Sequence, residues 1–120
     1  MNSQEQVRKV VQQYVDACMQ GSVDRLKAIF HPQALMSGYL AGQALIGSPE
    51  PFFQAVQAQP APAHSGADYL AEITSIEIEG DVACATLKEQ GFAGMNFTNF
   101  FHLMRTDGNW KIVSKTFTST

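Results

Sequence analysis

The strand-like run of residues 95–103 places one polar amide, Asn99, in a row of apolar side chains. Side chains alternate along a strand, so Asn99 shares its face with Met95, Phe97, Phe101 and Leu103. A buried amide is costly unless its donors and acceptors are paired, by a ligand or by another part of the protein. An amide takes up no proton as a base, which argues against proton abstraction here. Asn99 therefore predicts hydrogen bonding, to a ligand or within the core.

Lys115 is the second residue whose position suggests chemistry, because it alternates with Val113 and Phe117 on a strand face. A lysine there either extends to the rim and keeps its ammonium in water, or points its ammonium into the interior. We expect the solvated orientation, since long amphipathic side chains reach water easily. An inward Lys115 would attract a carboxylate or an enolate.

Tyr14 lies at the centre of an apolar stripe formed by residues three and four apart over residues 7–19. Its ring is therefore expected to be buried, and its hydroxyl needs a partner. That partner is either a backbone carbonyl or a ligand oxygen. Tyr39 and Phe53 are candidates to close the mouth of a pocket, although simple packing is the expected role of Phe53.

No acid–base pair is visible, so the catalytic residues stay unknown. His31 precedes a proline at the expected end of a helix, where the helix dipole favours a cation, and we expect a structural cap rather than a general base. Asp68 and Glu72 remain once the acids of turns and helix starts are set aside, and neither has an evident partner. His102 is expected to be buried in an interface.

The sequence predicts no metal site and no cofactor. Cys18 and Cys84 lie outside any Cys-x-x-Cys pair and are expected to be small core hydrophobes. The three histidines lack the spacing of zinc ligands, and there is no glycine-rich loop that could hold a phosphate.

Length and composition narrow the class of protein. The 120 residues are expected to form one domain over 1–120. A net charge of −3 with only 8 Lys and Arg and no basic run argues against nucleic-acid binding. Charged residues make up 16%, so the surface is either neutral or covered by a partner. The sequence has neither a membrane-spanning apolar run nor a signal-peptide pattern at its first residues, and we expect a cytoplasmic protein.

The spacing of apolar residues predicts three helices followed by a sheet. A first helix ends at Gly21, a second begins after Ser22 and stops before Pro32, and a third begins at Ser48 and stops before Pro60. From residue 67 onward, the spacing of apolar residues changes from the helical period of 3.6 residues to the strand period of 2 residues. Strands are predicted at 34–39, 43–46, 69–79, 82–90, 95–105 and 110–118, with a loop at 59–66 and hairpin turns at 80–81 and 107–109. Helices first and an antiparallel meander afterwards predict an α+β domain.

Several motifs along the chain then point to a family. They are Tyr14, Phe30-His31-Pro32-x-Ala34, Ile76-Glu77-Ile78-Glu79-Gly80-Asp81-x-Ala83, Phe97-Thr98-Asn99-Phe100-Phe101-x-Leu103 and Asp107-Gly108-x-Trp110-Lys111-Ile112-Val113-x-Lys115. With the order α-α-β-β-α-β-β-β-β, the chain resembles the nuclear transport factor 2-like, or cystatin-like, superfamily over nearly its whole length. The closest resemblance is to the bacterial subset labelled "putative lumazine-binding", or SnoaL-like.

This resemblance implies three helices on the concave face of a strongly curved, mostly antiparallel sheet, which together form a cone-shaped pocket. It also implies a homodimer through the outer face of the sheet. Such folds host isomerases, dehydratases, polyketide cyclases and binding modules, so fold does not fix activity. The candidate pocket residues are Tyr14, His31, Tyr39, Phe53, Phe97, Asn99, Phe101 and Lys115.

Three functions stay open. The first is a module that binds a small apolar or planar molecule, motivated by the aromatic, poorly charged strand face. The second is a lyase or isomerase acting on a small carbonyl compound, with Tyr14 or Lys115 as electrophile and Asp68 or His31 as base. The third is a dimerisation domain without a ligand, with Phe100, Met104, Trp110 or Ile112 in the contact.

Overall fold

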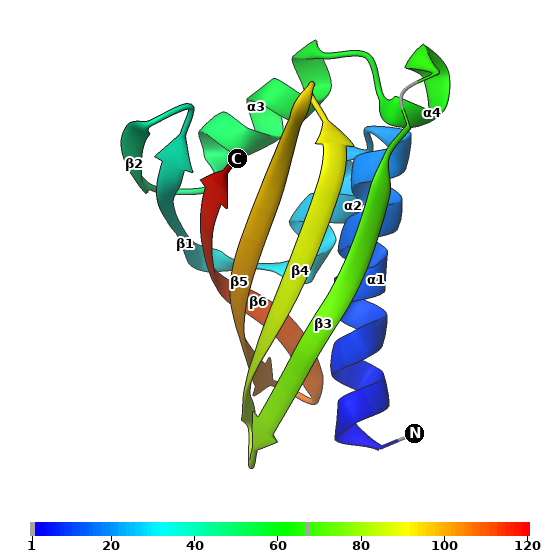
Figure 1. Cartoon of the computed structure of the whole chain (residues 1–120). Helices are drawn as coiled ribbons and strands as arrows, with labels where there is room; N and C mark the ends of the chain where they lie inside the picture. The colour runs from blue at the N-terminus through cyan, green and yellow to red at the C-terminus, as the bar shows by residue number, and fades with distance from the viewer. Residues whose placement is uncertain (1, 67) are drawn as a thin grey trace.

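Apolar residues spaced three and four apart form the buried stripe of α1 (Ser3–Gln20), the long helix at the N-terminus (Figure 1). The computed structural model describes residues 2–66 and 68–120. Gly21 ends α1 in the left-handed conformation, with φ of 67°, as predicted. Ser22 caps α2 (Val23–Ile29) by accepting a hydrogen bond from the amide of Arg25, which is also the predicted start.

Two further helices connect the two halves of the sheet. α3 (Glu50–Ala58) begins two residues after the predicted Ser48, whose hydroxyl still accepts a hydrogen bond from the amide of Glu50. The segment predicted as a loop at 59–66 contains a one-turn helix, α4 (Pro62–Ser65), so that part of the prediction was wrong. Pro62 favours this turn because its ring holds φ near the helical value at a first-turn position.

The strands form one six-stranded sheet in the order β2-β1-β6-β5-β4-β3. All neighbours are antiparallel except β1 and β6, which are parallel. The strands are β1 (Phe30–Leu40), β2 (Gln43–Gly47), β3 (Leu70–Glu79), β4 (Val82–Phe92), β5 (Met95–Thr106) and β6 (Asn109–Ser119). The turn between β5 and β6 has two residues rather than the predicted three, since Asp107 and Gly108 both adopt positive φ and Thr106 pairs with Asn109.

β1 begins at Phe30, four residues earlier than predicted. His31 therefore lies in a strand and not at a helix end, and the expectation of a helix cap at His31 was wrong. The pairing of β1 with β6 shifts between Phe30 and Leu35, where Pro32 has no N–H to donate to the ladder. The ring nitrogen Nδ1 of His31 instead accepts a hydrogen bond from the amide of Gln33, at 3.0 Å.

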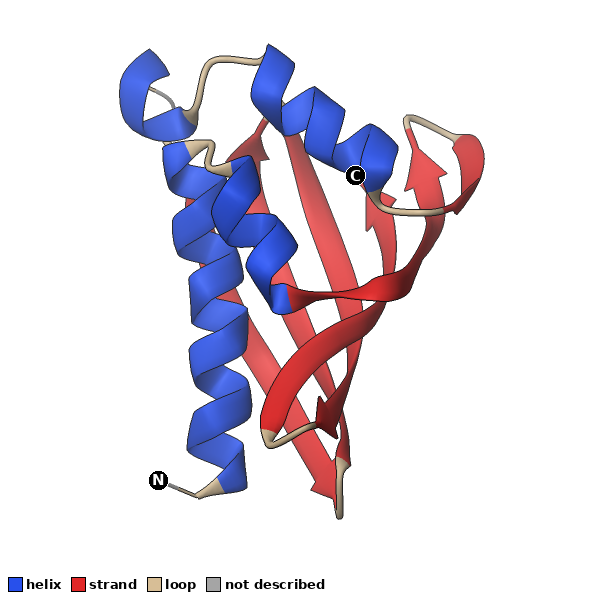
Figure 2. Cartoon of the chain, turned by 180° about the vertical axis from the view of Figure 1, so that it is seen from behind, coloured by secondary structure: helices blue, strands red, loops and turns tan. Residues whose placement is uncertain are grey.

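The helices cover one face of the curved sheet. Figure 2 shows α1 and α2 running along that face and α3 lying across the wide end, with the strands converging at the other end. The predicted α+β cone is confirmed. The largest fully buried side chains, which form the core between these layers, include Tyr14, Leu26, Leu87, Phe101, Leu103 and Ile112.

The outer face of the sheet carries exposed apolar side chains, among them Phe100 and Met104 on β5. His102 lies on this face and is exposed, so its expected burial is not found within the chain. Trp110 and Ile112, suggested as contact residues, are instead buried in the core. The homodimer expected across this face stays a prediction.

Residues 2–66 and 68–120 lack two kinds of feature. No helix there is long and apolar enough to cross a membrane. No cluster of three or more His, Cys, Asp or Glu side chains in the same residues could hold a metal ion. Cys18 is buried in the core as predicted, whereas Cys84 is only half-buried.

Gly38 allows β1 to lie closely against β6, and its replacement by alanine should destabilise the protein. A Cβ there would lie 2.1 Å from the carbonyl oxygen of Phe117 and 2.7 Å from its ring, and backbone cannot yield cheaply. We expect Gly38→Ala to lower the free energy of unfolding by about 1–3 kcal/mol, as overpacking does. Urea denaturation measures this. Gly47→Ala is the matched control, because its Cβ would meet no atom within 4 Å; an equal loss in both variants would contradict the interpretation.

Candidate functional site

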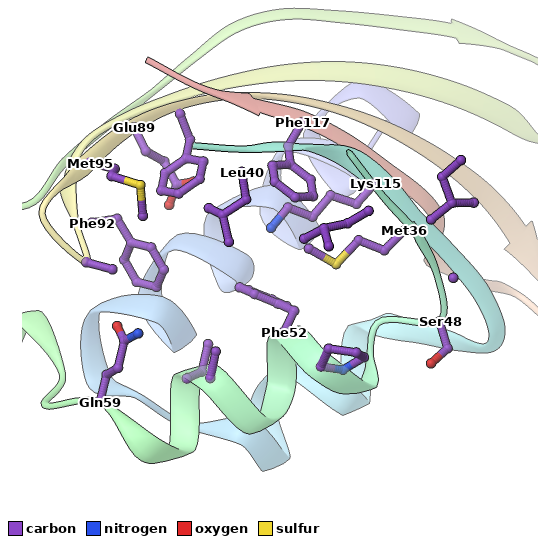
Figure 3. A pocket seen from close by; sticks show the side chains of 18 residues that line it. Met36, Leu40, Ser48, Phe52, Gln59, Glu89, Phe92, Met95, Lys115 and Phe117 are labelled. Carbon is purple, nitrogen blue, oxygen red and sulfur yellow. The ribbon is translucent and has the colours of Figure 1, made fainter. Parts of the chain in front are cut away.

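A cavity of about 310 Å³ lies between the inner face of the sheet and α3 (Figure 3). Strands β1 and β2 close one side, and the turn between β4 and β5 closes the other. Its walls are mainly apolar, and its polar lining is limited to a few side chains: Ser48, Gln59, Glu89 and Lys115. A mainly apolar cavity with a few converging polar groups is typical of a small-molecule site.

Lys115 points into this cavity, and the predicted solvated orientation was wrong. Its side chain is only 4% exposed, and Figure 3 shows its amine directed into the space above Phe52 of α3. The Nζ atom lies 3.8 Å from the centre of the Phe52 ring. Lys115 cannot reach the rim because β6 is central in the sheet, between β1 and β5, and the helices cover the face on which it lies.

The amine of Lys115 has one hydrogen-bond partner among the residues that the structure describes. Nζ donates to the hydroxyl oxygen of Tyr14, at 2.7 Å. An ammonium has three N–H donors, so two of them are left for the cavity. Tyr14 is thus buried beneath the cavity as predicted, and its hydroxyl partner is a side chain, an option not considered from the sequence.

Burial shifts the pKa values of this pair toward the uncharged forms. It lowers the pKa of Lys115 below its ordinary value of 10.5, and the negative charge of Glu89 opposes part of that shift. Burial also raises the pKa of Tyr14 well above its ordinary value, helped by the neighbouring Cys18. Burial thus makes the amine of Lys115 easier to deprotonate than that of an exposed lysine, and the phenol of Tyr14 harder to ionise.

Glu89 is the second charged side chain of the cavity, and sequence reasoning missed it. It is 3% exposed, and both of its carboxylate oxygens are paired. Oε1 accepts a hydrogen bond from Nδ2 of Asn99 at 2.7 Å, and Oε2 accepts one from the hydroxyl of Tyr69 at 2.5 Å. A signal was present in the sequence, since alternation along β4 places Glu89 on the same face as Ala83, Ala85 and Leu87.

Asn99 is paired within the protein and does not line the cavity. Its Nδ2 also donates to the carbonyl of Leu87, at 3.3 Å. Its Oδ1 is buried and has no partner among the described residues. The two bonds from Nδ2 fix the orientation of the amide, because the reversed amide would set an oxygen against two other oxygens. Asn99 thus holds Glu89 in place, which is the core alternative of the prediction.

The other candidates divide into three groups. Phe97 lines the cavity together with Lys115. Phe101 lies behind the cavity, where its ring is 4.9 Å from the ring of Tyr14, and Phe53 packs on Phe30 at 5.4 Å, as expected for simple packing. Tyr39 is 56% exposed and, like His31, is not among the lining residues. The tertiary structure adds lining residues that the sequence did not suggest: Met36, Leu40, Phe52, Phe92 and Phe117.

Comparisons with known proteins agree with this geometry. Residues 2–118 match a family described as "Putative lumazine-binding". A Cladobotryum protein named "Aldolase FrzH" is 32% identical over 107 residues, which cover 88% of this chain and 82% of that protein. An NTF2-like protein of unknown function from Silicibacter pomeroyi is 28% identical, with full coverage of both chains and a TM-score of 0.86. Another, from Methylobacillus flagellatus, is 24% identical over 100% of this chain and 95% of its own, with a TM-score of 0.89, and shows the shared fold.

Proposed function

Since the chain belongs to the family described as "Putative lumazine-binding", within the NTF2-like superfamily, we propose that its cavity binds a small, mainly apolar molecule that carries a carbonyl or carboxylate oxygen. The observation that carries the proposal is the amine of Lys115, which lies in an apolar cavity with donors left unpaired. A buried donor without a partner is costly, and a ligand oxygen would remove that cost.

The walls of the cavity indicate the polarity and size of the rest of the ligand. Aromatic and aliphatic side chains surround the space. Figure 3 shows Phe52 on the side of α3 and Phe117 on the side of the sheet, and Phe92 and Phe97 also line the cavity. About 310 Å³ lies at the small end of the usual range for ligand cavities, roughly 300–1,000 Å³. A single ring with a short side chain that carries the oxygen fits this description better than an extended or multiply charged molecule.

Lys115 and Glu89, the two charged side chains of the cavity, also determine the orientation that we expect for the ligand. The oxygens of Glu89 already accept hydrogen bonds from Asn99 and Tyr69, whereas Lys115 has donors to spare. A ligand oxygen is therefore favoured at the Lys115 end and disfavoured beside the carboxylate of Glu89.

Three molecules of one shape test the proposal: phenylacetate, ethylbenzene and phenethylamine. We expect phenylacetate to raise the melting temperature most, ethylbenzene to raise it slightly, and phenethylamine to have no effect, since only the carboxylate pairs with Lys115. A ligand at 100 times its Kd stabilises a protein by about 2.7 kcal/mol, which is readily measured by differential scanning fluorimetry. Lys115→Met should abolish the advantage of phenylacetate over ethylbenzene. Equal shifts from the anion and the cation, or no shift from any of the three, would contradict the proposal.

A second candidate function is aldolase-type chemistry, and one comparison favours it. The Cladobotryum relative, named an aldolase, is 32% identical over most of both chains. Making or breaking a carbon–carbon bond next to a carbonyl needs a group that withdraws electrons from the carbonyl and a base that moves a proton. Lys115 and Glu89, in one cavity, are residues of these two types. This function would use the same carbonyl-binding site.

A further inference from the structure

We propose that Lys115 reacts covalently with aldehydes and ketones in the cavity, so that its Nζ and the carbonyl carbon form a Schiff base. This inference rests on the proposed function, because a carbonyl compound must first occupy the cavity. It goes beyond that function, since a hydrogen bond from Lys115 would suffice for binding.

The amine of Lys115 is accessible from the cavity. The Nζ atom of Lys115 faces the same cavity as the apolar walls, and its one recorded protein partner is the oxygen of Tyr14. No carboxylate of the described residues lies within salt-bridge distance of the amine, because the one ion pair of those residues joins Arg105 to Asp81. A lysine held in a salt bridge would have its ammonium stabilised and its lone pair unavailable. Lys115 is not held in this way.

The burial of Lys115 also favours the reactive, deprotonated form of its amine. Only the neutral amine is a nucleophile, and an exposed lysine at neutral pH is almost entirely protonated. Burial lowers the pKa of Lys115, so a larger share of its amine is neutral. Desolvation in an apolar pocket is the established way in which proteins activate lysines for Schiff-base chemistry.

The groups around Nζ of Lys115 fit each step of Schiff-base formation. The lone pair of the neutral amine forms a C–N bond as the C=O electron pair moves to oxygen. A proton then moves from nitrogen to that oxygen, and Tyr14, whose hydroxyl oxygen lies 2.7 Å from Nζ, can relay it. The C–O bond breaks as the nitrogen lone pair completes the C=N bond, and the oxygen leaves as water after taking the remaining N–H proton of the original amine. Amine and carbonyl thus become imine and water, with no oxidant or reductant required.

The protonated Schiff base would also find its charge stabilised. Its nitrogen keeps the position of Nζ, 3.8 Å from the centre of the Phe52 ring, where a cation is attracted to the face of the ring. The carboxylate of Glu89 lines the same cavity and supplies the opposite charge. The rings of Phe117 and Tyr14 lie 5.2 Å from the same atom. The site is therefore suited to a cationic intermediate that carries an apolar substituent.

Benzoylacetone, an aromatic diketone, tests the inference without knowledge of the natural ligand. When a lysine amine attacks the diketone, the adduct loses water and becomes a stable enaminone. The enaminone has an absorbance band that neither reactant has. We expect one adduct on the wild-type protein, with the mass of the diketone less water, mapped by peptide mass spectrometry to Lys115. At least about tenfold more adduct should form at Lys115 than at exposed lysines such as Lys88, which lies outside the apolar cavity.

Three variants serve as controls. Lys115→Met should form no adduct, and Lys88→Met should react like the wild type because Lys88 is exposed on β4. Tyr14→Phe should form the adduct at the same site but more slowly, since it lacks the hydroxyl that relays the proton. Peptide mapping of the wild type identifies the site even if a variant folds poorly.

The outcomes separate the inference from the proposed function. If phenylacetate stabilises the protein but benzoylacetone leaves no adduct at Lys115, the Schiff base is refuted and the binding function stands. Adducts spread evenly over the exposed lysines would also refute the Schiff base. An adduct at Lys115 without any stabilisation by phenylacetate would support the covalent reaction and refute the carboxylate arm of the binding proposal.

Discussion

Glu89→Ala should lower the free energy of unfolding by about 3–5 kcal/mol, one of the two largest effects that we expect from a single substitution in this protein. The change removes both acceptors of a buried cluster. Nδ2 of Asn99 keeps only the carbonyl of Leu87, and the hydroxyl of Tyr69 loses the partner that the structure records for it. Lys115 also loses the opposite charge that shares its cavity. Chemical denaturation followed by circular dichroism measures the loss.

Two further variants show whether the buried hydrogen bonds cause that loss. Glu89→Gln keeps the volume, and its amide oxygen can still accept the hydrogen bond from Nδ2 of Asn99, while its amide nitrogen faces the hydroxyl of Tyr69 in place of an acceptor. We expect a smaller loss, about 1–2 kcal/mol. Glu79→Ala removes an exposed carboxylate from β3, and its effect should lie within about 0.5 kcal/mol. A loss for Glu89→Ala no larger than that for Glu79→Ala would contradict the assigned role.

Lys115→Met should have the opposite sign and stabilise the protein by about 1–3 kcal/mol, because no carboxylate among the described residues lies within salt-bridge distance to offset the cost of burying the charge of the amine. Methionine has a similar length and no charge, and it would pack against Phe52 and Phe117. The lowered pKa of Lys115 already includes its attraction to Glu89, so the folded protein disfavours the charged amine overall. The same variant should lose phenylacetate recognition and the diketone adduct.

This stabilisation should depend on pH. Because the pKa of Lys115 in the folded protein lies below its ordinary value of 10.5, the unfolded chain binds this proton more tightly than the folded chain does. The wild type therefore gains stability as the pH rises from the lowered pKa toward 10.5. The advantage of Lys115→Met should be greatest below that interval and shrink within it.

Urea denaturation of the wild type and of Lys115→Met over a pH series measures the difference between their free energies of unfolding. Lys88→Met serves as the surface control. A Lys115→Met variant that is less stable than the wild type at neutral pH would show that the charged amine contributes to folding. The expected result would instead mean that the protein keeps Lys115 at a cost in stability. Residues retained at such a cost are found mainly at functional sites.

Much of the fold could be predicted because local signals agreed with one another. Gly21 and Ser22 marked a helix end and a helix start, and the turn at 80–81 marked a hairpin. The alternation around Asn99 correctly placed it on the inner face of β5. Two of the errors fell at prolines: Pro32 lies in a strand and Pro62 opens a short helix, because a proline restricts φ without deciding which element follows.

The candidate site was predicted only in part. The sequence by itself determined which side chains share a strand face, so Asn99 and Lys115 stood out as polar groups among apolar neighbours. Only the tertiary structure decided that Lys115 is enclosed, that Glu89 binds Asn99 and Tyr69, and that Phe52 of α3 covers the amine. The reason is physical: alternation assigns a residue to a face of its own strand, but burial and pairing depend on which distant helix and strands lie against that face.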